Sequence, residues 1–313
     1  MAQSAVKPTV GHWLIILVLG AIWGSAFMAM ELALDGFGPL WVAALRTGLA
    51  VPALLAVAAV SGQSMRALAE NGVWRFVIPA GVFGMALPFF FLSWGQQYVP
   101  SAFAGIAMGS LPIVLVPLAY IFLPEEGLNL TKVAGLFVGF AGLVLLVGSE
   151  TSGAIIGEYS TMGRLACIAA TFGYAVASVI TRRSPPAPAV VFSCGALMFA
   201  TMLLVPLALL IEGVPRNIPA HALWAVVYAA LFPTALAAYW RVLVIKSAGS
   251  VFMSLVAYLV PIFSVIFGVA ILGEALEPQT YVALVLILAG IAVSQTKALR
   301  MVFGNAQKQP GAN

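Results

Sequence analysis

Two ionisable residues lie inside long apolar runs, where charged side chains are rare. Glu31 precedes the end of the first run by about one helical turn, and Arg46 follows the start of the second by about two. A charge at such a depth in a membrane is costly unless it is paired or faces water. We expect the two to form an ion pair that gates one side of the membrane, and Glu31 is the main candidate to carry a coupling proton. The alternative is that each side chain reaches the interface separately.

A second group of residues combines apolar surface with hydrogen-bonding tips, which suits a cavity that binds small solutes. Its members are Trp23, Phe27, Trp94, Gln97, Met108, Phe172, Tyr174, Phe232, Tyr239 and Tyr258. Walls of this kind fit neutral or zwitterionic solutes with apolar parts. They do not fit phosphorylated solutes, which favour clustered Lys or Arg. The alternative is that these residues fill gaps between helices or form the aromatic belt of a membrane interface.

Two prolines occupy matching places in two of the apolar runs. A proline inside a helix frees a carbonyl in the preceding turn, and in a membrane that carbonyl must be buried in protein or face a wet cavity. We expect Pro112 and Pro261 to form paired kinks beside the cavity. Plain helix packing is the alternative.

The elements that must position these residues follow from composition. The chain is 63% hydrophobic and 8% charged, with a mean hydropathy of +1.09, whereas a soluble domain carries about a quarter charged residues. Only helices and closed barrels cross a membrane, and these apolar runs are too long for barrel strands and do not alternate. The sequence therefore predicts an all-α integral membrane protein in the lipid bilayer. Ten spans are predicted, at about 12–34, 39–61, 73–97, 101–123, 130–148, 162–181, 189–211, 220–245, 250–272 and 279–297.

The basic residues predict the orientation of these spans. If the N-terminus is cytoplasmic, the inside segments hold eleven of the fourteen Lys and Arg residues, and the outside segments hold only Arg164 and Arg216. Such a bias is typical of cytoplasmic loops. We therefore expect both termini in the cytoplasm, with Glu31 and Arg46 toward the outer side.

The sequence also repeats itself. A shift of 149 residues places ten residues on identical ones without a gap, from Ser101 on Ser250 to Ala134 on Ala283. Since five spans per half is an odd number, the second half must insert upside down. The predicted units are residues 1–150 and an inverted 151–313. Inverted repeats are typical of secondary transporters, with the solute held between the halves.

Four phrases of the sequence resemble a known family of membrane proteins. The phrases "AIWGSAF", "LRTGLAV", "PSAFAGIAMGSLPIVLVPLAYIFLPEE" and "SAGSVFMSLVAYLVPIFSVIFGVAILGEAL" look like the EamA-type transporters of the drug/metabolite transporter superfamily. The resemblance implies a five-plus-five inverted repeat, an inner-membrane location, and a central cavity lined mainly by spans 1, 3, 4, 6, 8 and 9. Family members export amino acids, nucleosides and other metabolites. Arg46 matches an Arg of the family's second span, although Thr47 follows it where an aromatic is more usual.

Several functions are not indicated. The sequence holds no Walker loop and no set of residues typical of an intramembrane enzyme, so no enzyme activity, cofactor, metal or nucleic-acid partner is predicted. Cys167 and Cys194 are expected to be small buried side chains. Gly135, Gly139 and Gly142 predict close helix packing, with a dimer contact as the alternative to a monomer.

These patterns together predict a carrier that exports a small-molecule substrate, with amino acids as the expected class, across the inner (plasma) membrane by alternating access. An exporter of drugs or lipid intermediates with the same fold is the first alternative. A channel or membrane scaffold is the second.

Overall fold

A computed structural model describes residues 8–122, 130–148 and 158–303. Within these ranges the chain forms helices and connecting turns, and no β-strand occurs. The helices of the first half are α1 (Val10–Leu34), α2 (Pro39–Val60), α3 (Trp74–Gly81), α4 (Leu87–Gly95), α5 (Ser101–Gly109), α6 (Leu111–Phe122) and α7 (Leu130–Gly148), with short 3₁₀ turns η1 (Met65–Leu68) and η2 (Glu70–Gly72) before α3.

The second half repeats this order. Its helices are α8 (Glu158–Arg183), α9 (Ala189–Ile211), α10 (Ala220–Ala230), α11 (Ala237–Ala248), α12 (Ser250–Met253), α13 (Val256–Ala270), α14 (Pro278–Ser294) and α15 (Thr296–Phe303). Eight helical segments of the described chain are long and apolar enough to cross a membrane, and α13 and α14 are two shorter apolar helices. Each predicted span falls on one of these segments, so the predicted all-helical membrane architecture is confirmed.

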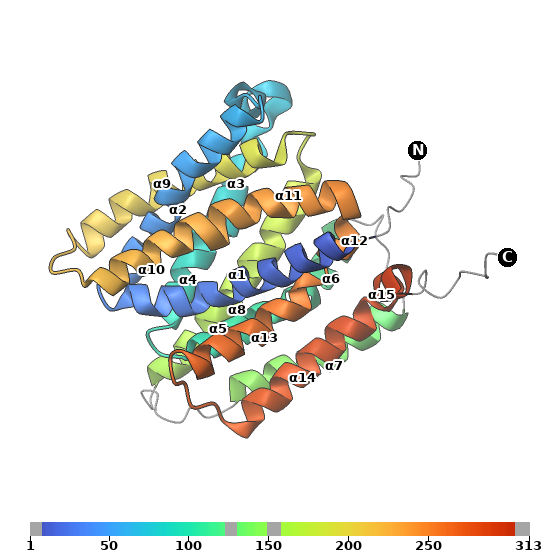
Figure 1. Cartoon of the computed structure of the whole chain (residues 1–313). Coiled ribbons are helices and arrows are strands. Elements are labelled where there is room, and N and C mark those ends of the chain that lie inside the picture. The colour runs from blue at the N-terminus through green and yellow to red at the C-terminus, as the bar shows by residue number, and fades with distance from the viewer. Residues whose placement is uncertain (1–7, 123–129, 149–157, 304–313) are drawn as a thin grey trace.

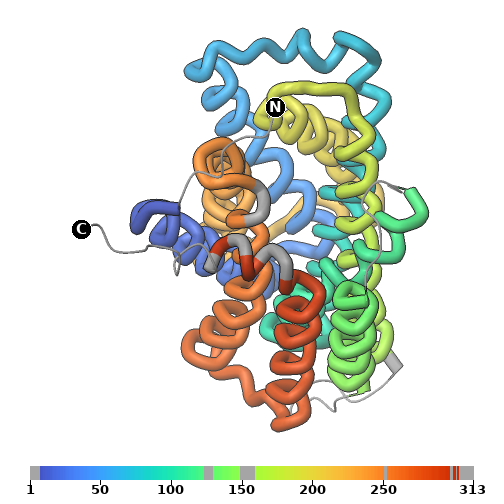
Figure 2. Tube along the Cα trace, turned by 90° about the vertical axis from the view of Figure 1, so that its right-hand side faces the viewer, coloured from blue at the N-terminus to red at the C-terminus, as the bar shows by residue number. Residues whose placement is uncertain are grey.

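The helices of the two halves interleave. In Figures 1 and 2, α2, α3 and α9 gather along one side of the bundle, α1 and α10 lie in the middle, and α7 and α14 form the opposite edge. Most close packing joins helices from different halves: α1 contacts α13 and α10, α2 contacts α9, and α5 contacts α13 and α8. The interior of the bundle is therefore largely an interface between the two halves.

Glycines allow α7 to approach α6 and α14 closely, and α1 to approach α13. On α7, a Cβ at Gly139 would lie 2.1 Å from the Ile113 side chain, and one at Gly135 would lie 2.4 Å from the Ser294 nitrogen of α14. On α1, a Cβ at Gly24 would lie 2.5 Å from Phe263 of α13. The glycine face of α7 is thus used within the chain, as the packing interpretation predicted.

Spans three and eight each contain a π-helical turn at the same place in the repeat. The turn η3 covers Val82–Ala86 and joins α3 to α4, and η5 covers Leu231–Leu236 and joins α10 to α11. The 149-residue shift that aligns the halves places Val82 on Leu231. Such turns are rare and occur frequently at functional sites.

The two predicted proline kinks differ. Pro112 lies in the first turn of α6, directly after the helix breaks at Ser110. Pro261 lies inside α13, and the interruption of that span comes earlier, at Ser254 and Leu255. The helix breaks therefore do not fall at the same distance from the two prolines, and a kink at Pro261 beside the cavity stays a prediction.

Two carboxylates of the second half cap helices of the first. Glu212, at the end of α9, accepts hydrogen bonds from two backbone amides in the first turn of α2, at 2.9 and 3.1 Å. Glu274, between α13 and α14, accepts from the amides of Ser101 and Ala102 at the start of α5, at 2.7 and 3.1 Å. Negative charge stabilises a helix N-terminus, so Glu274 has a structural role. Its repeat counterpart, Glu125, lies outside the described residues.

Candidate solute-binding site

One charged side chain is buried in the interior of the bundle. Arg46 of α2 is 6% exposed, and its Nε donates a hydrogen bond to the Thr234 hydroxyl at 3.0 Å. Its Nη1 contacts the Met30 sulfur at 2.9 Å, and the guanidinium lies 4.0 Å from the centre of the Phe89 ring. This last contact is a cation–π interaction. The guanidinium therefore joins α1, α2, α4 and the turn η5.

The hydroxyl that receives Arg46 is oriented by the π-helical turn. Thr234 donates its own proton to the carbonyl of Ala229, five residues earlier, at 2.9 Å. The hydroxyl oxygen is then free to accept from Arg46. On the other side, the Tyr174 ring of α8 lies edge-on to Phe89, with 6.5 Å between ring centres. We call Arg46, Met30, Phe89, Tyr174 and Thr234 the Arg46 site.

The predicted ion pair between Glu31 and Arg46 is absent from the described structure, and that prediction is wrong. Met30, not Glu31, faces Arg46. Consecutive residues of a helix point about 100° apart, so Glu31 is directed elsewhere. It lies near Gln96 and Glu274 instead.

A second polar cluster therefore surrounds Glu31. Gln96 is buried and donates from Nε2 to the Phe27 carbonyl at 2.8 Å. The Glu31 Oε2 and the Gln96 Oε1 are both enclosed, and neither has a hydrogen-bond donor among the described residues. Buried acceptors without donors are unfavourable. A proton on Glu31 would supply a donor where two acceptors now lie. We call Glu31, Gln96 and Glu274 the Glu31 cluster.

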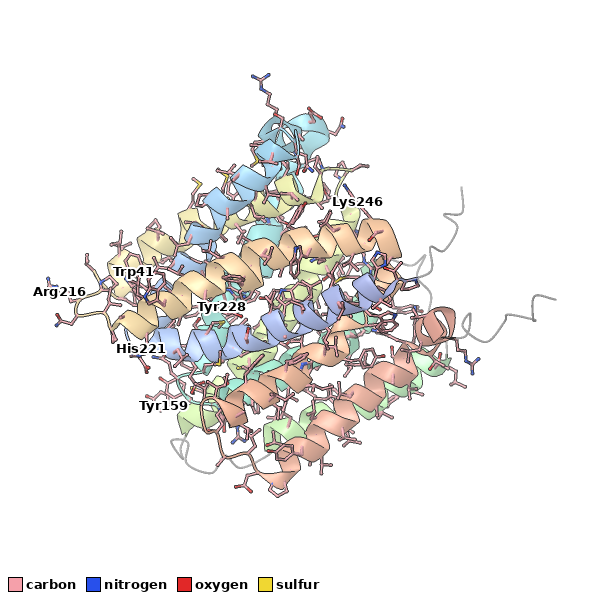
Figure 3. The ribbon with its side chains drawn as sticks, viewed as in Figure 1. Trp41, Tyr159, Arg216, His221, Tyr228 and Lys246 are labelled. Atoms are coloured by element: carbon pink, nitrogen blue, oxygen red, sulfur yellow. The ribbon has the colours of Figure 1, made fainter. Side chains whose placement is uncertain are left out.

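Hydrogen bonds also join α1 to α10 and η5. The indole nitrogen of Trp23 donates to the Pro233 carbonyl at 2.9 Å, and the hydroxyls of Ser25 and Tyr228 lie 2.7 Å apart. Tyr228 is visible between these elements in Figure 3. Its ring stacks on Phe232, with 5.1 Å between ring centres. Trp23, a residue predicted to line the cavity, is half-buried and links α1 to η5 through its hydrogen bond.

Three further predicted residues lie against the interior core. Phe27 is 6% exposed. Met108 receives a hydrogen bond from the Thr171 hydroxyl on its sulfur, at 3.4 Å. Tyr258 of α13 packs against a buried cluster that includes residues of α1, and its hydroxyl is enclosed without a partner in the described residues. Of the three, Phe27 contacts the Glu31 cluster through its backbone carbonyl, which accepts from Gln96, whereas Met108 lies beside Thr171 of α8.

Other predicted residues lie elsewhere, and their assignment is corrected. Gln97 is exposed at the end of α4, and Gln96 takes the interior position. Phe172 is 50% exposed on the same outer stripe of α8 as Leu165, seven residues earlier. Trp94 belongs to an aromatic row with Tyr98, at 5.0 Å, which favours the interfacial belt.

The last two predicted aromatics are peripheral to both clusters. Phe232 is 43% exposed beside Tyr228. Tyr239 is half-buried and packs against apolar residues of α2 and α9. Among the described residues, Phe232 contacts Tyr228 and Tyr239 contacts the apolar side chains of α2 and α9, rather than Arg46 or Glu31.

An apolar groove opens at the end of the bundle where α1 begins. It has a volume of about 440 Å³ and is lined by Trp13, Leu14 and Leu17 of α1, by Tyr258 and Leu259 of α13, and by Leu299 of α15. Tyr258 thus faces the groove and the core together.

The EamA-like transporter family matches this chain twice, at residues 11–148 and 161–296. The chain belongs to this family. An aromatic amino acid exporter of Ancylobacter novellus, YddG, is 31% identical over 230 residues, which are 73% of this chain and 77% of that protein. Two of the other relatives are similar to this chain over most of their length.

A probable terminal-alkyne amino-acid exporter of Streptantibioticus cattleyicolor is 26% identical over 92% of this chain and 94% of its own. An uncharacterized transporter of Archaeoglobus fulgidus is 26% identical over 90% and 97%. The crystal structure of another protein superposes on this chain with a TM-score of 0.67. The two chains are 25% identical, and the superposition covers 94% of this chain and 99% of the other. The EamA family chain is thus a multi-pass membrane transporter.

The Arg46 site yields a stability prediction. Thr234→Val removes the oxygen that accepts from Arg46 Nε, so we expect the free energy of unfolding to fall by about 1.5–3 kcal/mol, the usual range for a hydrogen bond to a charged group. Thr234→Ser keeps the hydroxyl and should retain most of the stability. Thermal unfolding in detergent measures the difference. Thr201→Val is the control, since that hydroxyl bonds only to its own helix; equal losses in Thr234→Val and Thr201→Val would contradict the assignment.

Proposed function

We propose that this EamA-family protein is a ten-span, inverted-repeat carrier that exports amino acids across the inner membrane by alternating access. The observation that carries the proposal is the Arg46 site, where one buried cation lies among aromatic and thioether groups at the contact of the two halves. A solute held there touches both halves. Its passage is then linked to their relative movement.

The distribution of basic residues supports a cytoplasmic location for both termini. Lys246 lies at the end of the bundle where α1 begins and α15 ends, whereas Arg216 and His221 lie at the opposite end (Figure 3). Arg182 and Arg183 end α8, which runs back toward the α1 start. This asymmetry follows the positive-inside rule.

The expected substrate class rests on the site and on two relatives. The relatives from Ancylobacter novellus and Streptantibioticus cattleyicolor are named as exporters of amino acids. The Arg46 site supplies aromatic surface from Phe89 and Tyr174, which suits an apolar side chain. A monomer is expected, because the glycine face of α7 is already occupied by α14.

One observation favours a second function. The apolar groove between α1 and α13 is wide enough for a drug-sized molecule or an acyl chain. An exporter of drugs or lipid intermediates would use such a surface. A channel or scaffold remains the alternative of a different class.

Counterflow in proteoliposomes tests these functions. We expect liposomes preloaded with L-phenylalanine to accumulate labelled L-phenylalanine, because a carrier exchanges solute across the membrane without net flux. Uridine and a cationic dye serve as the nucleoside and drug arms, and protein-free liposomes are the control. Accumulation of the dye alone would support the second function, and equal leakage of all three solutes would indicate a channel.

We further propose that Glu31 carries a coupling proton, because its enclosed Oε2 lacks a donor that protonation would supply. Glu31→Gln imitates the protonated form permanently. We expect this variant to keep solute exchange at equal pH and to lose accumulation driven by a pH gradient. Glu277→Gln is the control, because the Glu277 side chain makes no capping hydrogen bond to α14 in the described structure.

Labelled solute uptake with and without a pH gradient measures both properties. If Glu31→Gln still accumulates solute in response to the gradient, Glu31 is not the coupling group. If wild type shows no response to the gradient, the carrier is not proton-coupled.

A further inference from the structure

The Arg46 guanidinium is a buried cation without an anion. No carboxylate among the described residues forms an ion pair with it, and its contacts are the Thr234 hydroxyl, the Met30 sulfur and the Phe89 ring. An arginine stays charged in proteins, and removing a charge from water without a counterion costs several kcal/mol. The charge of Arg46 is therefore not balanced by a carboxylate of the described residues.

The neutral contacts leave part of the guanidinium available. They take up Nε, Nη1 and one face of the planar group. Nη2 has no hydrogen bond to the described residues, and it is not among the side-chain atoms that the protein encloses completely. The planar fork of arginine matches a carboxylate with two parallel hydrogen bonds. The free edge is thus suited to a small oxyanion.

The surroundings restrict which anion would be bound. A single guanidinium balances one negative charge, whereas phosphorylated solutes favour several cations. The Phe89 and Tyr174 rings offer apolar surface next to the charge. This combination fits a monocarboxylate that carries an aromatic or aliphatic group.

We propose that Arg46 binds the carboxylate of the transported solute and so selects monocarboxylates with an apolar side group. This inference rests on the proposed function, because it assigns a specificity-determining residue to the same site. The competing explanation is that Arg46 only fastens α1, α2, α4 and η5 together. The two explanations differ in whether Arg46 distinguishes a carboxylate from the neutral carboxamide group at the same position of the solute.

The test compares L-phenylalanine with L-phenylalaninamide on the full chain in lipid nanodiscs. Binding of each probe is measured by calorimetry for wild type, Arg46→Gln and Arg46→Lys. We expect wild type to bind the acid about 10- to 100-fold more tightly than the amide, the range for a charge-assisted pair. Arg46→Gln should lose that preference and bind the amide within about twofold of wild type. Arg46→Lys, which keeps the charge without the fork, should lie between them.

Arg75→Gln is the matched control, since Arg75 is an exposed arginine that also lies over an aromatic ring, Trp74. It should keep the preference for the acid. If Arg46→Gln fails to fold, wild type and Arg46→Lys still decide the question. The proposal is overturned if wild type does not prefer the acid, if neither probe binds, or if substitution at position 46 weakens both probes equally.

Counterflow of the same two probes separates this inference from the proposed function. Binding that prefers the acid through Arg46, without counterflow, would support the site and contradict the carrier. Counterflow of L-phenylalanine that is unchanged in Arg46→Gln would support the carrier and contradict the site.

Discussion

The arrangement of this bundle depends on one buried guanidinium. Arg46 lies in an apolar interior, where its charge must be solvated by whatever groups surround it. Those groups come from three other elements, of which η5 belongs to the second half of the sequence while α1 and α4 belong, like Arg46 on α2, to the first. Bringing the halves together is therefore also what solvates the cation. The π-helical turn contributes directly, since it directs the Thr234 proton away from Arg46.

Other contacts between the halves are of a different kind. Glu212 and Glu274 bind the N-termini of α2 and α5 through charged hydrogen bonds, whereas α1 and α13 meet through the close approach at Gly24. Charged caps at the ends of helices can separate and re-form in water, but a glycine contact is lost once helices part. The two charged caps are therefore contacts that can be broken and re-formed, whereas the Gly24 contact holds α1 against α13.

The sequence alone predicted the helical class, the position of each apolar segment and the glycine face of α7, because hydropathy and residue size determine these features. It did not predict which way individual side chains point. The spans are apolar on all sides, so their helical phase cannot be read from amphipathicity. An error of one residue exchanged Gln96 for Gln97, and the same error paired Glu31 with Arg46 where Met30 makes the contact. Thr234 was missed because its role depends on a π-helical turn that no composition signal marks.

The central claim is that the buried guanidinium marks the solute site. A structure of the full chain determined by electron cryomicroscopy with L-phenylalanine bound tests it most directly. We expect the solute to lie between the two halves, with its carboxylate within hydrogen-bond distance of Arg46 and its ring beside Phe89 and Tyr174. A solute bound elsewhere, such as in the apolar groove of α1 and α13, with Arg46 still held only by Thr234, Met30 and Phe89, would contradict the account.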